Sequence, residues 1–254
     1  MDVVEKLFSL KGRRAVVTGG GGGLGAEMAC ALAAAGAAVV VVGRRQAALE
    51  HTAARIAKAG GEAAIVAADL GAADAIDEVV ARAQAVGGID VLINAAGINE
   101  RMPADALGRA AWEASIRINL TVPFLLAQAV VGGMRERGWG RIINIGSLQS
   151  VRAFPDSIAY GAAKGGIVQL TRAMAEAWSA DGVCCNAIAP GLFPTELTRA
   201  VFENGSAEVM AARTCIGRNG RLDDIWGVTL FLASDASAFM TGQTLFLDGG
   251  FTAR

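Results

Sequence analysis

A glycine-rich turn between a strand and a helix places the strongest constraint on the fold. Lys11–Thr18 ends in a short β-branched strand, Gly19–Gly25 reads Gly-Gly-Gly-Gly-Gly-Leu-Gly, and Ala26–Ala35 is rich in strong helix formers. Glycines let a backbone approach a pyrophosphate closely, and a helix N-terminus offers N–H groups and a favourable dipole. Five consecutive glycines alone would equally suit a flexible turn. With a strand before them and a helix after them, they predict the first half of a dinucleotide-binding unit.

Strand and helix patterns alternate along the remainder of the chain. Six further short apolar runs read as strands: Val39–Val42, Glu62–Ala68, Ile89–Ile93, Ile142–Ile145, Val183–Ala189 and Gln243–Leu247. Four longer helical patterns lie among them: Ala72–Val86, Trp112–Val131, Ser157–Ala180 and Asp223–Ser234. The alternation predicts an α/β protein with a single doubly wound parallel sheet of the Rossmann type and helices on both faces.

The length suits one domain. A chain of 254 residues can bury a substantial core, and no linker, repeat or low-complexity segment divides it. We therefore predict a single NAD(P)-binding domain over residues 1–254. Glu196–Ala212 is polar and mixed in composition, which predicts a mobile substrate lid over residues 192–215 or so.

Composition argues against several classes of partner. Lys+Arg of 23 and Asp+Glu of 24 leave a net charge of −1, which favours neither nucleic acid nor an anionic membrane. The apolar stretch Met28–Gly43 is shorter than the ~20 residues of a membrane span and reads as helix, turn and strand. Met1–Lys6 lacks the basic start of a signal peptide. We expect a cytoplasmic protein with a small-molecule substrate and no nucleic-acid or membrane partner.

The cysteines and the one histidine predict no metal site. The cysteines, at Cys30, Cys184, Cys185 and Cys215, fit neither a metal-ligand spacing nor a disulfide framework. His51 lies in an expected exposed helix. We expect reduced cysteines that pack, with Cys184 and Cys185 on opposite faces of their strand.

The segment Ser147–Lys164 carries the candidate chemistry. Tyr160 is the only tyrosine, and Lys164 follows it by four residues, on the same face of a helix. A phenol titrates near ~10, and a nearby cation lowers its pKa, which makes it a usable acid or base. Ser147 ends a strand, and its hydroxyl could bond the substrate oxygen that Tyr160 serves. By itself the spacing is equally explained by a packed tyrosine and a solvated lysine.

Two positions bear on the choice of dinucleotide. The strand Val39–Val42 is followed by Gly43, Arg44 and Arg45, with no acid to hold the ribose hydroxyls. Arg44 and Arg45 could instead bind a 2′-phosphate, which favours NADP(H) and leaves NAD(H) possible; two solvated arginines are the alternative. Asp69, followed by Leu70, could contact the adenine or cap the next helix.

Asn119 interrupts an apolar helical pattern. A polar amide there is unfavourable unless it has a partner. It could bend the helix and hold a water molecule.

Together these motifs resemble a classical short-chain dehydrogenase/reductase over essentially the whole chain. The matching motifs are Thr18-Gly19-x-x-x-Gly23-x-Gly25, Asn94-Ala-Ala-Gly97, Pro190-Gly191 with Thr195, and Thr241-Gly242 to Asp248-Gly249-Gly250. Ala95 departs from the family's Asn-Asn-Ala-Gly pattern. The resemblance implies these cofactor-binding residues: Gly19, Gly23, Leu24, Gly25, Arg44, Arg45, Asp69, Leu70, Asn94, Gly97, Tyr160, Lys164, Pro190, Gly191, Phe193 and Thr195.

The resemblance also implies a mechanism with four catalytic residues: Asn119, Ser147, Tyr160 and Lys164. Hydride would move between the nicotinamide and a carbinol or carbonyl carbon, while Tyr160 exchanges the proton and Ser147 orients the oxygen. Lys164 would lower the tyrosine pKa and bind the nicotinamide ribose, and Asn119 would hold a water molecule. Family members commonly form homotetramers, and an apolar Trp226–Phe231 face would be compatible with one.

Within the family, the wording of three segments is most similar to gluconate 5-dehydrogenases: Ser147–Ser150, Asn94–Asn99 and Ala189–Thr198. These enzymes interconvert a sugar acid and its keto form, so a sugar acid or polyol is the expected substrate. The side chains expected to face it are Asn99, Arg101, Gln149 and Arg152. Arg101 or Arg152 could pair with a carboxylate, and a solvated loop position explains each arginine equally well.

Two other functions fit parts of the pattern. A 3-oxoacyl-[acyl-carrier-protein] reductase would share the fold, cofactor and catalytic residues, and would need a basic docking patch near the cleft; Arg135, Arg137 and Arg172 are the candidates. A non-catalytic dinucleotide sensor would have no need for an intact set of Ser147, Tyr160 and Lys164.

Overall fold

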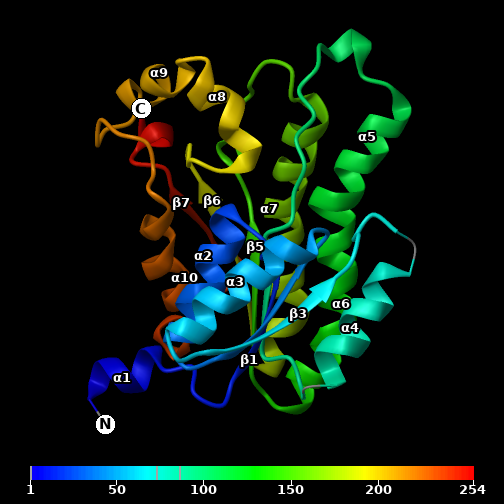
Figure 1. Ribbon diagram of the computed structural model, residues 1–254, viewed down its shortest axis with the longest axis vertical. Coiled ribbons are helices and arrows are strands. Elements are labelled where there is room, and N and C mark those ends of the chain that lie inside the picture. The colour runs from blue at the N-terminus through cyan, green and yellow to red at the C-terminus, as the bar shows by residue number, and fades with distance from the viewer. Residues whose placement is uncertain (1, 73, 86) are drawn as a thin grey trace.

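The computed structural model describes residues 2–72, 74–85 and 87–254. Seven parallel strands form one sheet in the order β3-β2-β1-β4-β5-β6-β7, with helices on both faces (Figure 1). The strands are β1 (Arg14–Thr18), β2 (Ala38–Gly43), β3 (Glu62–Ala67), β4 (Val91–Asn94), β5 (Gly140–Ile145), β6 (Val183–Pro190) and β7 (Thr244–Leu247). This arrangement confirms the predicted doubly wound sheet.

The helices are α1 (Val3–Phe8), α2 (Gly23–Ala34), α3 (Gln46–Lys58), α4 (Ala75–Ala85), α5 (Arg109–Ile116), α6 (Val122–Glu136), α7 (Ile158–Trp178), α8 (Arg199–Glu203), α9 (Ser206–Ala212) and α10 (Ile225–Ala233). A π turn (Arg117–Thr121) joins α5 to α6, and short 3₁₀ turns include Leu148–Ser150, Glu196–Thr198, Leu222–Asp224 and Phe251–Ala253. The helices α8 and α9 lie with the C-terminus at one end of the molecule, far from α1 (Figure 1).

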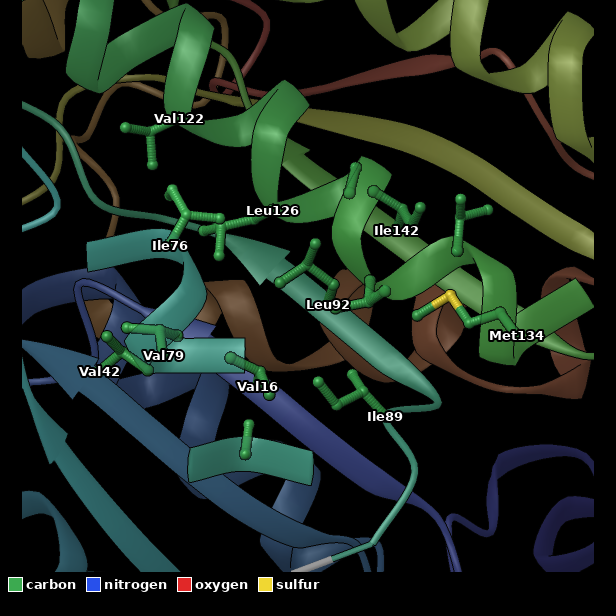
Figure 2. Packing of buried hydrophobic residues seen from close by; sticks show 14 of the residues in the cluster. Val16, Val42, Ile76, Val79, Ile89, Leu92, Val122, Leu126, Met134 and Ile142 are labelled. Atoms are coloured by element: carbon green, nitrogen blue, oxygen red, sulfur yellow. The ribbon is translucent and has the colours of Figure 1, made fainter. Parts of the chain in front are cut away.

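Two hydrophobic cores lie between the sheet and the helices on its two faces. Successive strand residues point to opposite faces, so Val16 joins one core and Val17 the other. The first core packs the sheet against α4, α6 and α7, with Leu92, Leu126 and Met134 inside it (Figure 2). The second packs the sheet against α2, α3 and α10. Strands buried on both faces explain the continuous Val/Ile runs in the sequence.

The helix predicted over Trp112–Val131 is wrong as one regular element, because the π turn interrupts it. Pro123 lacks an N–H group and cannot form the bond to the fourth residue before it, Asn119. Asn119 Nδ2 meanwhile donates to the carbonyl oxygens of Ile98 at 2.8 Å and Ser115 at 3.0 Å. The amide therefore has partners in a widened turn, as π bulges allow.

Other element boundaries also differ from prediction. α2 begins at Gly23, so the last part of the glycine motif is helical, and a 3₁₀ turn precedes α10. α4 begins at Ala75, later than expected; the predicted end of this helix, Val86, and its residue Ala73 lie outside the described residues, as does Met1. Three short helices, α1, α8 and α9, were not predicted, because segments this short carry little periodicity.

The helical run Arg109–Glu136 has 28 residues and is long and apolar enough, by length and composition, to cross a membrane. A core helix passes the same test, and 44% of its most apolar window is buried inside the protein. Its α6 portion supplies Leu126, Ala127 and Val130 to the first core. Packing against the sheet accounts for its apolar character.

The cysteines of the described chain are all free. Cys185 is buried in the first core, while Cys184 turns to the other side of β6 and its Sγ lies 3.8 Å from the carbonyl oxygen of Ala238. The two faces predicted for this pair are confirmed. Within the described ranges, no three His, Cys, Asp or Glu side chains are grouped as metal ligands would be.

A buried polar chain joins two central strands to α7. Asn94 and Asn144 are register partners on β4 and β5, and Asn94 Nδ2 donates to Asn144 Oδ1 at 2.9 Å. Asn144 Nδ2 donates to Thr171 Oγ1 at 2.9 Å, and Thr171 Oγ1 donates to the carbonyl oxygen of Ile167 at 2.7 Å. Because these groups are buried, each depends on its neighbour for a partner.

Thr171→Val tests this chain. It keeps the side-chain shape but removes the oxygen acceptor of Asn144 Nδ2 and leaves only the weak acceptor Met174 Sδ at 3.9 Å, so we expect the free energy of unfolding to fall by about 1–3 kcal/mol. Thr229→Val on α10 is the matched control, because Thr229 is also fully buried and its Oγ1 donates to its own helix, at Ile225, while no other side chain of the described residues bonds to it. Chemical denaturation at one protein concentration would measure both losses. Equal losses would contradict the role of the chain.

Candidate active site

Four strand ends meet at the carboxyl edge of the sheet. β1 leads into the glycine-rich turn (residues 19–25), β4 ends at Asn94, β5 runs into Ser147, and β6 ends at Pro190. The chain order reverses between the neighbouring strands β1 and β4. Loops that leave such neighbours in opposite directions open a crevice, where ligands of α/β sheets bind.

Ser147 is held by the loop that follows β5. Its N–H donates to Ser150 Oγ at 3.2 Å, and its own Oγ accepts from the N–H of Gln149 at 3.1 Å. Ser150 Oγ then donates to the carbonyl oxygen of Lys164 at 2.6 Å. The loop is thereby tied to α7, which fixes the Ser147 hydroxyl relative to that helix.

Tyr160 and Lys164 lie one turn apart on α7 and are 9% and 4% exposed. Lys164 Nζ is 5.5 Å from the centroid of the Tyr160 ring. It donates to the carbonyl oxygen of Ile145 at 2.6 Å. The lysine predicted to be near the phenol is therefore near its ring, and its ammonium is anchored to the end of β5.

The acid–base properties of the pair are set first by burial. Burial raises the pKa of Tyr160, while the Ser147 hydroxyl and the positive charge of Arg101 act in the opposite direction. Burial also lowers the pKa of Lys164 to about 8. For Tyr160, loss of hydration outweighs the Ser147 hydroxyl and the charge of Arg101, and the lowering of its pKa by Lys164 stays a prediction.

Asn119 lies fully buried in the π turn. Its Nδ2 bonds to Ile98 and Ser115, whereas its Oδ1 has no hydrogen-bond partner within the described chain. A Cβ at Gly97 would lie 2.9 Å from that oxygen, so only glycine allows the loop after β4 to pass so close. A buried acceptor without a partner is suited to a water molecule, as the sequence predicted.

The glycine-rich turn is shaped by backbone contacts that exclude side chains. A Cβ at Gly25 would lie 2.3 Å from the carbonyl oxygen of Gly19, and one at Gly19 would lie 2.8 Å from that of Ala95. α2 begins with Gly22 as its N-cap, and neither a side-chain cap nor an acid in the first turn occupies this end. Its first N–H groups can therefore bind an anion such as a pyrophosphate.

A cleft of about 290 Å³ lies between this turn and the segment that follows β6; Gly23, Thr195, Glu196, Arg199 and Phe202 are among its lining residues. Thr195 lies directly over the turn, because a Cβ at Gly23 would be 3.0 Å from its Cγ2. Glu196 reaches further and forms a hydrogen-bonded ion pair with Arg45, an exposed residue like Arg44.

The other predicted cofactor residues differ in exposure and in what they contact. Asp69 is exposed, and its Oδ1 accepts from the N–H of Gly71 at 3.0 Å in a local turn that precedes α4, so it does not cap that helix. Leu70 is buried in the first core, and Leu24 packs against the second. Phe193 is 2% exposed and packs beside Gly220. The side chains of Leu70 and Phe193 are therefore buried and support the site by packing.

The predicted substrate residues separate into two groups. Arg101 is exposed, and its charge reaches Tyr160. Gln149 borders Ser147, and the buried Asn99 Oδ1 has no hydrogen-bond partner in the described chain. Arg152 instead donates to the carbonyl oxygen of Arg254 at 2.6 Å, on the side where Phe154 stacks on Phe251. Its guanidinium is thus engaged with the C-terminal turn.

Sequence reasoning missed three residues that organise this site. Ser150 links the Ser147 loop to α7, and Thr18 Oγ1 accepts from the N–H groups of Ala95 and Ala96, both at 3.1 Å. The Ser-x-x-Ser spacing of a capping box was a signal for Ser150. Glu196 gave no such signal, because its partner Arg45 lies 151 residues away in the chain.

Comparisons with known proteins agree with this geometry. A family model described as enoyl-(acyl carrier protein) reductase matches residues 20–252. Gluconate 5-dehydrogenase of Gluconobacter oxydans is 40% identical over 248 residues, which cover 97% of each chain.

Solved structures are similar over nearly the full length as well. A gluconate 5-dehydrogenase from Burkholderia cenocepacia, in complex with NADP and tartrate, has a TM-score of 0.93 and 41% identity, with 99% of each chain covered. A 3-oxoacyl (acyl-carrier-protein) reductase from Agrobacterium tumefaciens, with NADP bound, has a TM-score of 0.92 and 35% identity, with 98% of this chain and 97% of that one covered. From the sheet, the crevice and these relatives together, the chain belongs to the short-chain dehydrogenase/reductase family.

Proposed function

We propose that this enzyme transfers a hydride between NADP(H) and a secondary alcohol or ketone, with a sugar acid or a related polyol as substrate, in the manner of a gluconate 5-dehydrogenase. The observation that carries the proposal is the burial of Tyr160 and Lys164 together on α7, beside Ser147 at the end of β5. Burying an ammonium costs free energy, and buried titratable groups of this kind cluster at functional sites. A structural role alone would leave this pair without an explanation.

The residues of the chain divide the proton chemistry among them. When bound, NADP(H) supplies or accepts the hydride. Tyr160 exchanges the proton with the substrate oxygen, and Ser147, whose hydroxyl acts on the phenol, orients that oxygen. Lys164 holds a positive charge near the Tyr160 ring from its anchor on Ile145. Asn119 offers its unpaired Oδ1 to a water molecule.

The cofactor assignment rests on the groups that surround the cleft. The glycine-rich turn and the uncapped start of α2 suit the pyrophosphate. Arg44 and Arg45 follow β2 where an NAD-specific enzyme has an acid. Two similar structures are described as NADP complexes. These observations support NADP(H) as the preferred cofactor and NAD(H) as a weaker one.

The substrate class rests on charge at the crevice. The positive charge of Arg101 acts on Tyr160, so a carboxylate on the substrate could lie near it while a hydroxyl faces the phenol. The Burkholderia gluconate 5-dehydrogenase is described with tartrate, which carries both of these groups. Arg101 is therefore the preferred partner of a sugar acid, ahead of Arg152.

A 3-oxoacyl-[acyl-carrier-protein] reductase is the second candidate, because one similar structure has that activity in its description. The proposed docking patch does not favour it. Arg135 pairs with Asp181 at 2.6 Å and Arg137 with Asp90 at 3.1 Å, so both charges are already partnered. Arg135 lies in the last turn of α6, and Arg137 follows that helix. Both therefore lie near the start of β5, at the opposite end of the strands from the crevice.

We also propose a cytoplasmic homotetramer. The Trp226–Phe231 face is partly covered, because these side chains pack against the second core and Trp226 Nε1 donates to Glu27 at 3.0 Å. Exposed Phe124 on α6 and Phe246 on β7 support contacts through the long helices and the last strand.

The first prediction concerns the reaction. Purified enzyme should reduce NADP with gluconate faster than with neutral polyols and faster than it reduces NAD. Tyr160→Phe should lower kcat by roughly 10²–10⁴-fold, because the proton then has no carrier. Absorbance of the reduced cofactor measures both. Silence on the sugar-acid panel, with turnover of a 3-oxoacyl thioester, would transfer the assignment to the reductase.

The second prediction separates the two arginines. Arg101→Gln should lower kcat/KM for gluconate about tenfold, the value of one charge-assisted hydrogen bond, and should lower kcat/KM for a neutral polyol much less, because only the effect of the charge on Tyr160 is then lost. Arg152→Gln should affect gluconate less, because its guanidinium is bonded to the C-terminal turn. Steady-state kinetics on both substrates measures the difference. A larger effect at Arg152 would contradict the assignment.

The third prediction concerns pH. Because burial opposes the charged form, Lys164 should be an ammonium below pH about 8 and a neutral amine above it, in contrast with its ordinary 10.5. NMR of ¹³C-labelled lysine in the cofactor-free enzyme should show one signal that titrates there. Lys6, Lys11 and Lys58 are exposed, and Lys164→Met identifies the signal by removing it. Four signals that titrate together would refute the shift.

A further inference from the structure

An ion pair crosses the mouth of the cofactor cleft. Arg45 lies just before α3, and Glu196 begins the 3₁₀ turn that follows β6. Arg45 Nη1 donates to Glu196 Oε1 at 2.9 Å, and Arg45 Nη2 donates to the other carboxylate oxygen. Both terminal nitrogens of the guanidinium are therefore bound to one carboxylate.

Glu196 is held in place by its own turn. Thr195 and Thr198 bond to each other, with Thr195 N–H donating to Thr198 Oγ1 at 3.0 Å, and this fixes the backbone on either side of Glu196. Thr195 also contacts the glycine-rich turn at Gly23. Thr195 and Glu196 thus span the cleft, with Thr195 against Gly23 and Glu196 against Arg45.

The pair contributes little to stability, because the Arg45 and Glu196 side chains are 64% and 57% exposed. Its effect on an anionic ligand is greater. A guanidinium presents its donors as a planar fork, and the carboxylate uses the end of that fork that a phosphate would use. A carboxylate at this place also repels a phosphate.

We propose that Glu196 is a residue that determines cofactor specificity: it competes with the 2′-phosphate of NADP(H) for Arg45 and so reduces the preference for NADP(H) over NAD(H). The inference rests on the proposed function, in which Arg45 binds that phosphate. Binding of NADP(H) must break the pair, whereas NAD(H) leaves it intact. The hydrogen bond from Arg45, together with the charges of Arg45, Arg199 and Arg44, holds the pKa of Glu196 below its usual range, so it competes as an anion.

Direct binding tests the inference without turnover. The probes are 2′,5′-ADP, which carries the phosphate, and 5′-AMP, which lacks it. Glu196→Gln keeps the shape and removes the charge, and we expect it to bind 2′,5′-ADP roughly fivefold tighter, the size of a surface charge interaction, with 5′-AMP unchanged. Isothermal titration calorimetry of the full-length protein gives both dissociation constants.

Two further variants make the result specific. Glu203→Gln on α8 removes the same charge from the same exposed lid, and no ion pair involves Glu203 within the described residues; we expect less than a twofold change for either probe. In an Arg45→Gln background, Glu196→Gln should no longer tighten 2′,5′-ADP.

Three outcomes would overturn the inference. Equal tightening of both probes would show a general charge effect. Weaker binding of 2′,5′-ADP by Glu196→Gln would show that Glu196 orients Arg45 for the phosphate. If neither the wild type nor Glu196→Gln distinguishes the two probes, Arg45 does not bind the phosphate. Gluconate turnover by wild-type enzyme is measured separately, so failure here leaves the proposed reaction to be judged by its own experiment.

Discussion

The contact of the glycine-rich turn with itself and with the end of β4 is the constraint on which the site depends. Gly25 lies against the carbonyl oxygen of Gly19, and Gly19 against that of Ala95, at distances that no Cβ tolerates. Thr18 Oγ1 reinforces the approach by accepting from two N–H groups of the β4 exit loop. Because β1 and β4 are neighbours at the point where the strand order reverses, this packing defines one wall of the crevice.

The opposite wall depends on polar groups that the fold buries and then partners. Lys164 donates to Ile145, Ser150 joins Ser147 to Lys164, and the Asn94–Asn144 pair holds β4 and β5 in register. A buried polar group without a partner is destabilising, so each bond restricts how the strand ends can move against α7. The same burial that rigidifies the site also changes its acid–base chemistry, raising the pKa of Tyr160 and lowering that of Lys164.

The segment that follows β6 contacts two distant parts of the chain beside the crevice. Thr195 lies over Gly23, and Glu196 pairs with Arg45. These contacts place Glu196 on the arginine that we propose binds the 2′-phosphate. The C-terminal turn packs nearby: Phe251 stacks on Phe154, and Arg213 of the lid region lies over the Phe251 ring at 4.5 Å.

The sequence by itself determined the doubly wound parallel sheet, the glycine-rich turn and the spacing of Tyr160 and Lys164, because periodicity and turn chemistry are local properties of the chain. It also identified Asn119 as a polar residue in need of partners. Tertiary structure decided the rest. It interrupted the predicted helix at the π turn Arg117–Thr121, bonded Arg152 to the C-terminal residue, made burial outweigh charge at Tyr160, and brought Glu196 to Arg45. Each of these depends on groups far apart in the chain, and on hydration lost only when the elements pack together.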